Sequence, residues 1–391
     1  MTLLEALAAA AALVLASPSL VAMCAIFRRQ GRSPESGDTA LPRLLFLVPA
    51  HDEQEMIGHC IQSLTSQNYP ASHRDVVVIA DNCSDETSDV ARSAGAKVLE
   101  RNDPQHRGKP RALAWAIELL RLDDCDAVVI VDADTEVDAG FAAGLVVHAP
   151  LAGKAVQTYF GTLNEWDNWL TRLAGLLARA RYEVVYPAKA RAGLNVPLTG
   201  NGMCIGRDLL ANGGWQSFGL TEDLELYARL TSMGIPIRYS RNSLLYSQEV
   251  TTLAQGRTQR DRWARGRLEV LLQSAPIVWR STLIGWTQKA DVLMELALPS
   301  PVLRFVIALS AMLFSLLLAG PWRLVLAVGA LGFVAPDIVA LSIALLRHPQ
   351  RGRTLAALLM LPWYAAWRVM VATRGAVSPR DMTWRKTARN R

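Results

Sequence analysis

Short apolar runs alternate with helix-like patterns through the first third of the chain. Three runs are almost wholly apolar, as strands buried on both faces of a parallel sheet are: residues 44–48, 75–80 and 127–131. The segments around them have the spacing of helices: residues 53–67, 86–94 and 110–122. Strands that alternate with helices predict an open, doubly wound α/β sheet, in which ligands bind beyond the carboxyl ends of the strands.

Longer apolar segments stand near both ends of the chain. Residues 3–27 are long enough to cross a bilayer, and residues 301–320 and 323–346 predict an out-and-back hairpin. Basic residues follow both parts, which predicts that the chain between them is cytoplasmic. A cleaved signal peptide is the alternative for residues 3–27. A signal peptide begins with positively charged residues, whereas the start of this segment carries Glu5 and no Lys or Arg.

A further apolar stretch, residues 354–372, carries Trp, Tyr, Pro and Arg and is expected to lie in the membrane interface. The predicted organisation has six parts: 1–28 N-terminal transmembrane anchor, 29–42 linker, 43–273 cytoplasmic globular domain, 274–300 interfacial segment, 301–346 transmembrane hairpin, and 347–391 basic loop, interfacial helix and cytoplasmic tail.

Composition agrees with a globular domain joined to membrane segments. The chain has 391 residues, of which 51% are hydrophobic and 19% charged, and a formal net charge of +6. Because most of the excess Lys and Arg flanks apolar segments, no nucleic acid partner is expected. Five scattered cysteines without a CxxC motif argue against a disulfide framework or a structural zinc site.

Carboxylates follow each of the three predicted strands. Asp52 and Glu53 follow the first, Asp81 the second, and Asp132 and Asp134 the third. In an extended segment Asp132 and Asp134 would project to the same face, where two carboxylates and a substrate phosphate could hold Mg²⁺ or Mn²⁺. A turn after a strand explains the same residues without a metal. Asp81 could bind a base or ribose, or cap the next helix.

Two acidic residues and one lysine are further candidates. Lys109, beside a glycine at a helix start, is a candidate phosphate counter-charge, although a solvated lysine fits the same pattern. Glu222 and Asp223 open a predicted helix, where acids are favoured by the helix dipole. A carboxylate there could also act as general base toward an acceptor hydroxyl.

A basic helical stretch, residues 255–271, places Gln259, Arg262 and Trp263 on adjoining parts of one surface. Arg can bind phosphate with paired hydrogen bonds, and a Trp ring can stack on a sugar. A membrane-adjacent basic segment explains the arginines but not the Gln and Trp. The chain lacks GxGxxG after the first strand and lacks Walker A, GxSxG and HExxH motifs, which removes support for dinucleotide, P-loop, acyl-transfer and zinc-protease chemistry.

Together these residues resemble the membrane-bound family 2 glycosyltransferases, which include hyaluronan, chitin, cellulose and poly-N-acetylglucosamine synthases and ceramide glucosyltransferases. The motifs occur in the family's order: VPAHDEQEMI (48–57), VIADNCSDET (78–87), RGKPRAL (107–113), VDADT (131–135), TED (221–223) and QRDRW (259–263). The resemblance implies an A-type glycosyltransferase domain, Rossmann-like with a mostly parallel sheet and flanking transmembrane helices. It also implies an activated donor, most often a UDP-sugar, and inversion at the anomeric carbon.

The resemblance also implies roles for the candidate residues. Asp81 and the segment from Pro49 to Glu53, including Ala50, would contact the uridine. Residues 50–53 differ from those of many relatives, which have an aromatic residue and an Asn in this motif. Asp132 and Asp134 would hold the diphosphate and the metal, and one acid, Asp223, would be the base. The remaining expected substrate contacts are Lys109, Glu222, Gln259, Arg262 and Trp263.

The expected function is inverting transfer of a sugar from a nucleotide-sugar to a saccharide acceptor in envelope or extracellular polysaccharide synthesis, at a bacterial-type inner membrane. The alternative is a single transfer to a membrane lipid. A non-catalytic membrane scaffold ranks lower, because the key acids are present, and a transporter lower still. Three predicted spans are fewer than in synthases that thread their own polymer, so a polymer product would call for a secretion partner or a homo-oligomer.

Overall fold

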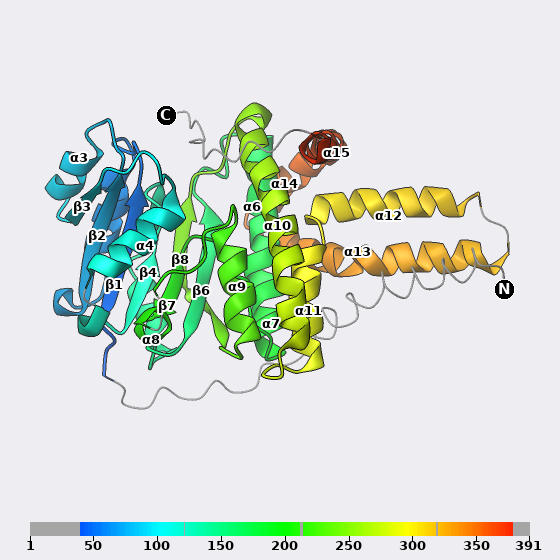
Figure 1. Cartoon of the computed structure of the whole chain (residues 1–391). Coiled ribbons are helices and arrows are strands. Elements are labelled where there is room, and N and C mark those ends of the chain that lie inside the picture. The colour runs from blue at the N-terminus through cyan, green and yellow to red at the C-terminus, as the bar shows by residue number, and fades with distance from the viewer. Residues whose placement is uncertain (1–39, 121, 212–213, 318–319, 378–391) are drawn as a thin grey trace.

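The structure is a computed structural model that describes residues 40–120, 122–211, 214–317 and 320–377. The predicted anchor at residues 3–27, most of the linker and the end of the basic tail lie outside the described residues. Figure 1 shows a sheet with its helices at one end of the molecule and a helical hairpin that projects from the other end.

The described strands form one mixed sheet in the order β3-β2-β1-β4-β7-β6-β8-β5. Their bounds are β1 Leu44–Ala50, β2 Arg74–Asp81, β3 Lys97–Arg101, β4 Ala127–Ile130, β5 Thr135–Val137, β6 Ala155–Thr162, β7 Met203–Gly206 and β8 Ile237–Ser247. The strands β3, β2, β1 and β4 are parallel, as are β6 and β8, whereas β7 is antiparallel to both of its neighbours. The sheet is mostly parallel, which confirms the predicted fold class.

The core explains why the three predicted strands are continuously apolar. Alternate residues of β1, such as Leu45 and Phe46, point to opposite faces of the sheet and enter two different hydrophobic clusters. Val128 and Val129 of β4 divide between the same two clusters. Both faces of these strands are therefore buried, which favours apolar side chains on each face.

The helices in the first part of the chain match the predicted segments but are shorter. The described helices are α2 Ile57–Thr65, α3 Thr87–Ser93, α4 Lys109–Leu119, α5 Phe141–Val146, α6 Trp169–Arg179, α7 Tyr186–Arg191, α8 Arg207–Ala211, α9 Glu222–Ser232, α10 Leu253–Arg280, α11 Trp286–Ala297, α12 Pro301–Ser315, α13 Pro321–Arg347, α14 Arg351–Leu358 and α15 Leu361–Val377. A π-helical segment, η3 Ala180–Val185, joins α6 to α7.

Among the described residues, α13, with 27 residues, is the one helix that is by itself long and apolar enough to cross a membrane. Helix α12 has 15 residues and reaches the required length only together with α11, from which it is bent by 87°. The pair α14 and α15 also passes only as a bent unit, with an angle of 51°. Helix α12 ends at Ser315, within the span expected at residues 301–320.

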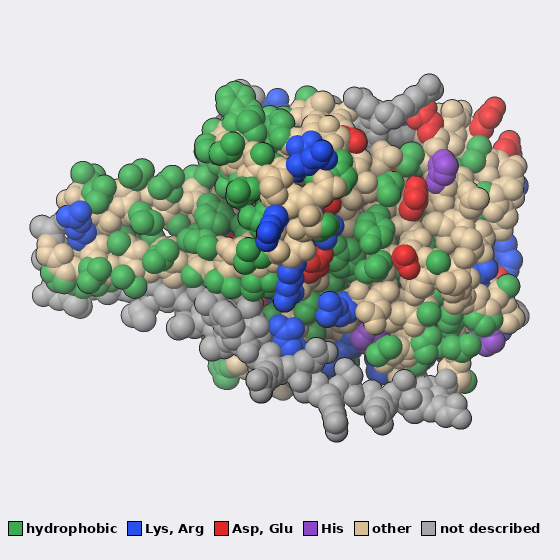
Figure 2. Space-filling view, turned by 180° about the vertical axis from the view of Figure 1, so that it is seen from behind, with side chains coloured by type: hydrophobic (Ala, Val, Ile, Leu, Met, Phe, Trp, Pro, Cys, Tyr) green, Lys and Arg blue, Asp and Glu red, His purple; other side chains and the backbone are tan. Residues whose placement is uncertain are grey.

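The helices α12 and α13 stand side by side and project from the globular part as a hairpin (Figure 1). Figure 2 shows hydrophobic side chains over both helices, and Lys and Arg side chains where the hairpin meets the globular part. The exposed large apolar residues of the hairpin include Leu309, Leu313, Phe314, Leu324, Val328 and Leu331. An apolar surface of this extent is typical of a membrane or protein contact.

The inner end of α13 is embedded in the globular part. Directly after α13, the fully buried imidazole of His348 lies 2.8 Å from Glu165 Oε1. Two alanines of α13 also share a small buried cluster with residues of α6 and η3: Leu176, Ala180, Val184, Ala340 and Ala344. The hairpin and the globular part are thus joined by a shared core.

Gly206, at the end of β7, gives a first testable prediction. A Cβ atom there would lie 2.1 Å from the carbonyl oxygen of Ala152 and 2.2 Å from that of Leu151, and backbone cannot move aside easily. Gly206→Ala is expected to destabilise the fold by about 1–3 kcal/mol, the usual effect of overpacking. The midpoint of thermal unfolding, followed by Trp fluorescence in detergent, should fall by several degrees.

The matched control is Gly153→Ala, because a Cβ at Gly153 would meet no atom within 4 Å. Its unfolding midpoint should stay close to that of the unsubstituted protein. Equal midpoints for the two variants would contradict the close approach of β7 to residues 151–152.

Candidate active site

The segment after β4 forms a turn that positions Asp132. The backbone N–H of Thr135 donates to the carbonyl of Asp132 at 3.1 Å. Residues 132–135 therefore form a turn and not an extended segment. The Asn201 side chain holds the turn: its oxygen accepts from the N–H of Asp132 at 3.1 Å, and its amide donates to Thr135 Oγ1 at 2.7 Å. Asp134 is buried, and its Oδ1 accepts from Ser247 Oγ at 3.2 Å.

The two acids of this turn have different surroundings. The Asp132 side chain is 37% exposed, whereas Asp134 is 6% exposed. Asp132 is therefore the more accessible of the two expected metal ligands.

Lys109 lies at the start of α4, after Gly108, whose φ of +112° suits glycine. Its ammonium donates to Asp132 Oδ1 at 2.5 Å and to the carbonyl of Gly200 at 2.5 Å, and it lies 3.9 Å from Glu222 Oε1. Burial lowers the pKa of Lys109, but the attraction of Asp132 and Glu222 outweighs burial, and the net pKa is raised. The Lys109 side chain is therefore held in an ion pair and is not a freely solvated lysine.

Glu222 and Asp223 occupy the first turn of α9 and lie against the same loop. A Cβ on Gly200 would lie 3.3 Å from Asp223 Oδ2, so glycine leaves the room that this carboxylate occupies. Asp223 Oδ1 accepts from the N–H of Leu224 at 2.8 Å. We call the charged residues gathered around Gly200 the central cluster: Lys109, Asp132, Glu222 and Asp223.

Burial in the central cluster raises the pKa values of the two acids of α9, Glu222 and Asp223. Burial raises the pKa of Asp223, and the Leu224 N–H and Lys109 act in the opposite direction. Burial and the negative charge of Asp223 raise the pKa of Glu222, again opposed by Lys109. A buried acid pair with raised pKa values beside a cation is typical of groups that accept and release protons.

Asp81, at the end of β2, is 5% exposed and belongs to a second group. Its carboxylate accepts from Arg101 Nη1 at 2.6 Å and from the N–H of Gly108 at 3.3 Å. The N–H of Thr87, at the start of α3, bonds instead to Asp85 Oδ1 at 3.0 Å, so Asp85 and not Asp81 serves that helix end. Asp81 is held in place by Arg101 and linked through Gly108 to the start of α4.

The loop after β1 is tied to the loop after β2. The N–H of Glu53 donates to Thr87 Oγ1 at 2.8 Å, and the Cys83 thiol donates to the carbonyl of Ala50 at 3.6 Å. The expected uridine contacts Ala50, Glu53 and Asp81 therefore lie at the ends of β1 and β2 and on the interlocked loops that follow them. These loops stand at the carboxyl ends of neighbouring parallel strands.

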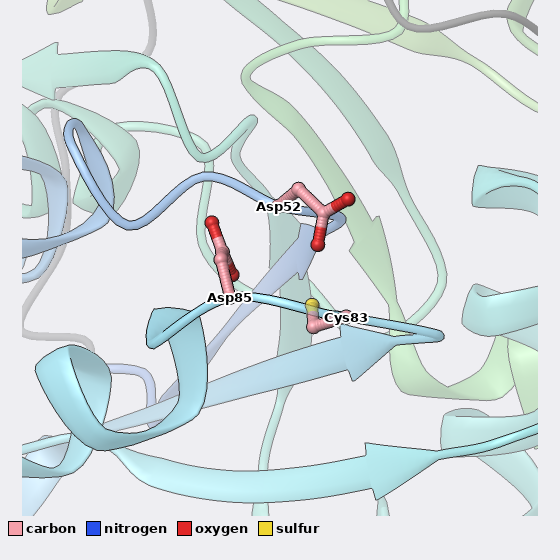
Figure 3. A group of neighbouring side chains, drawn as sticks. All are labelled: Asp52, Cys83 and Asp85. Carbon is pink, nitrogen blue, oxygen red and sulfur yellow. The ribbon is translucent and has the colours of Figure 1, made fainter.

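Figure 3 shows Asp52, Cys83 and Asp85 on these loops, with potential metal-binding atoms that lie within 4.8 Å of one another. Hydrogen bonds within the protein engage both acids. Asp52 Oδ1 accepts from the N–H of Ser84 at 2.7 Å, and Asp85 Oδ2 accepts from the N–H of Gln54 at 3.2 Å. We therefore interpret this group as a brace between the two loops.

Helix α10 crosses the start of α9. A Cβ on Gly266 would lie 2.7 Å from both Cγ2 and Oγ1 of Thr221, so the two elements approach closely. Arg262 lies one turn earlier on the same face of α10. Arg262 Nε and Thr221 Oγ1 are buried, and among the described residues neither has a hydrogen-bond partner.

The other two residues of the QRDRW motif lie on the same helix. Trp263 is 40% exposed, and the guanidinium carbon of Arg260 lies 5.0 Å from the centre of its ring. Gln259 is half-buried. Their expected contacts with the diphosphate and the acceptor sugar stay predictions.

Sequence reasoning missed two residues that shape the site. Asn201 holds the Asp132 turn, and its one signal was its place in a glycine-rich segment. Arg101 fixes Asp81 from β3, an edge strand with polar residues at both ends and no long apolar run. Both residues act on parts of the chain distant in sequence, which local patterns cannot reveal.

Comparison with known proteins supports the family resemblance of the sequence motifs. The model of the family described as glycosyltransferase like family 2 matches residues 42–266. A beta-monoglucosyldiacylglycerol synthase of Synechocystis sp. is 29% identical over 276 residues, which cover 66% of this chain and 55% of the relative. A poly-beta-1,6-N-acetyl-D-glucosamine synthase of Staphylococcus aureus is 24% identical over 252 residues, which cover 62% and 58%. The chain thus matches little more than half the length of these relatives.

Among solved structures, the mannosyltransferase PcManGT of Pyrobaculum calidifontis, in complex with GDP-Man and Mn²⁺, superposes with a TM-score of 0.59. The two chains are 20% identical, and the match covers 96% of this chain and 99% of the other, so the likeness supports the fold. The family match spans more than half of this chain and includes the central cluster and the first part of α10. The chain belongs to the family 2 glycosyltransferases.

Proposed function

We propose that this enzyme is an inverting, membrane-bound transferase that moves a sugar from a UDP-sugar to an acceptor hydroxyl. The observation that carries the proposal is the central cluster, in which a strand-end acid, a cation and a buried acid pair meet around Gly200. Transfer from a nucleotide-sugar needs these same elements: charge stabilisation for a leaving diphosphate and a base for the attacking hydroxyl.

The donor end of the site fits a divalent metal. Asp132 and Asp134 offer carboxylate oxygens, the ligands that Mg²⁺ and Mn²⁺ prefer. The ammonium of Lys109, held 2.5 Å from Asp132 Oδ1, shows that this position already stabilises positive charge. When bound, the metal would supply positive charge against the diphosphate. Lys109 and Arg262 would add their own charges to the leaving group.

The acceptor end of the site centres on Asp223. Ionised Asp223 would take the proton of the acceptor hydroxyl at Oδ2, while its Oδ1 is held by the N–H of Leu224. Glu222, with its raised pKa, stays protonated more readily and so limits the repulsion between the two acids. Asp81, Ala50 and the backbone near Glu53 would hold the nucleoside on the interlocked loops.

A saccharide acceptor is the first candidate. Its support is Trp263, an exposed aromatic ring on the helix that crosses the start of α9, since such rings stack on sugars. The product would then belong to an envelope or extracellular polysaccharide. A lipid acceptor is the second candidate, and the support is the 29% identity to a beta-monoglucosyldiacylglycerol synthase.

We also propose that α11 lies in the membrane interface beside a multi-pass anchor. The bend of 87° between α11 and α12 would place α11 parallel to the membrane plane when the hairpin stands across the membrane. At the turn between α10 and α11, Trp279 and Trp286 are exposed and contact each other, with ring centres 5.0 Å apart. Trp residues are typical of membrane interfaces. The catalytic domain would lie on the cytoplasmic side.

A donor screen tests the proposed function. Full-length protein in detergent, supplied with Mn²⁺ and a bacterial membrane lipid extract, is incubated with UDP-glucose, UDP-galactose, UDP-N-acetylglucosamine or GDP-mannose. We expect release of UDP from one UDP-sugar together with a radiolabelled product. A ladder of products supports the saccharide acceptor, and a single glycolipid supports the lipid acceptor. Release from GDP-mannose alone, or from no donor, would contradict the UDP-sugar proposal.

A further inference from the structure

A second cluster of buried charges lies between α7 and α11, away from the motif residues. The ammonium of Lys189 lies 3.0 Å from Asp291 Oδ2 and 3.2 Å from Glu295 Oε2. The hydroxyl of Tyr227, in α9, donates to Asp291 at 3.4 Å. The cluster therefore joins α7 and α11 to the helix that carries Asp223.

Arg267, on α10, binds the end of α11. It donates through Nη1 to the backbone carbonyls of Glu295 and Leu298, the latter at 3.3 Å, and so binds the last turn of α11. The preceding residue, Gly266, is the contact point of α10 with Thr221, two residues before Asp223. One half-buried arginine thus lies at the junction of α9, α10 and α11.

We propose that Arg267 is a positioning residue for the base: it fixes α10 to the end of α11 and holds a positive charge beside Asp223. The inference rests on the proposed function, in which Asp223 accepts the proton of the acceptor. It adds a residue outside the motifs, and it gives the buried cluster of Lys189, Asp291 and Glu295 the role of anchoring α11 beneath Arg267.

The charges around Asp223 support this role. Charged or titratable groups on four elements interact electrostatically with Asp223: Lys109 of α4, Glu222 of α9, Tyr182 of η3 and Arg267 of α10. Burial raises the pKa of Asp223, and Lys109 and Arg267 are the side chains whose positive charge lowers it. Because Lys109 is already shared with Asp132 and Gly200, Arg267 is a separate source of positive charge for the base.

The sign of the effect follows from these charges. Asp223 works as a base only when ionised, so activity rises with pH through the pKa of Asp223. Removing the charge of Arg267 would raise that pKa, and the acidic limb of the pH profile would move to higher pH. An opposite charge at short range shifts a carboxyl pKa by about 1–3 units, so a shift near the lower end is expected for this half-buried arginine.

The test compares Arg267→Gln with Arg267→Lys in the full-length protein. Gln removes the charge and keeps a hydrogen-bond donor, whereas Lys keeps the charge and loses the paired donors. For Arg267→Gln, the acidic limb of kcat/KM should move up by about one pH unit, with a loss of about tenfold below the limb and little loss above it. Arg267→Lys should keep the limb of the unsubstituted enzyme.

The controls separate positioning from folding. Arg280→Gln, at the exposed end of the same helix, should leave the pH profile unchanged. Should Arg267→Gln fail to fold, as judged by thermal unfolding, Arg267→Lys alone decides: a shifted limb in that variant overturns the proposal. For a folded Arg267→Gln, an unchanged limb or a loss that is equal at all pH values also overturns it.

Failure of this inference can be told apart from failure of the proposed function. If Asp223→Asn retains transfer, the base assignment is wrong and the limb belongs to another group. If Asp223→Asn is inactive but Arg267→Gln keeps the original limb, only the role of Arg267 is wrong.

Discussion

Replacing Asp223 with Asn is expected to lower kcat/KM for sugar transfer by about 10²–10⁴, the range of general base catalysis. The amide of Asn has the same shape, so the hydrogen bond from the N–H of Leu224 can be kept, but the amide cannot take the proton of the acceptor hydroxyl. Initial rates with a radiolabelled donor give the measurement. Binding of UDP should change little, because no diphosphate contact is assigned to Asp223.

The matched control is Asp124→Asn, because Asp124 is an exposed aspartate in the short 3-10 helix Leu122–Asp124 before β4. That variant should transfer sugar at the normal rate. If Asp223→Asn kept more than a tenth of the activity, Glu222 would become the candidate base, because its carboxyl shares the central cluster and has a raised pKa.

Replacing Asp132 with Asn, or removing divalent metal with a chelator, is expected to have the second largest effect. Asp132 is the more accessible acid of the turn after β4, so its loss would remove a metal ligand and a partner of Lys109. We expect kcat/KM to fall by about 10²–10³, comparable to the loss of one electrostatic contact to a developing charge. The Mn²⁺ concentration for half-maximal rate should rise as well.

Titration of Mn²⁺ and Mg²⁺ against the initial rate measures both quantities. Chelated enzyme should regain its activity when either metal is restored, whereas Asp132→Asn should not regain full activity at any metal concentration. Asp89→Asn is the surface control, because the side chain of Asp89 in α3 is exposed. A chelated enzyme that transfers sugar at the full rate would contradict the role of a metal at this turn.

The strands β1, β2 and β4 could be predicted from the sequence because they are buried on both faces. Residues 44–48, 75–80 and 127–131 are strands in the structure because each of them lies inside the sheet between two hydrophobic clusters. The strands β6, β7 and β8 gave no comparable signal. Strand β6 buries Gln157 and Thr158, whose side chains donate to backbone carbonyls at 2.9 Å. Because these polar residues interrupt the apolar pattern, the sequence does not mark β6 as a buried strand.

The sequence pointed to the candidate residues but not to their geometry. The acids at strand ends lie at one edge of the sheet because parallel strands bring their carboxyl ends there, with Asp81 bound to Arg101 and Asp132 to Lys109. The turn at Asp132 depends on Asn201, which is 69 residues away in sequence. Contacts over such distances arise from tertiary packing, and no local pattern contains them.

The membrane segments show a related difficulty. Apolar length predicted a span at residues 301–320, but α12 ends at Ser315, and the N–H groups of Leu316 and Leu317 make tight i→i+3 bonds to Leu313 and Phe314. Composition measures how apolar a segment is. It does not show where the helix stops.

The shared core at the inner end of α13 has a consequence for the reach of the enzyme. Because Ala340 and Ala344 are packed against η3, and His348 is bonded to Glu165, α13 and the globular part form one packed unit. With α13 across the membrane, as we propose, this packing would fix the height of Asp223 above the lipid surface. A lipid acceptor would then have to bring its hydroxyl to that height, so the length of its head group would select which molecules are glycosylated.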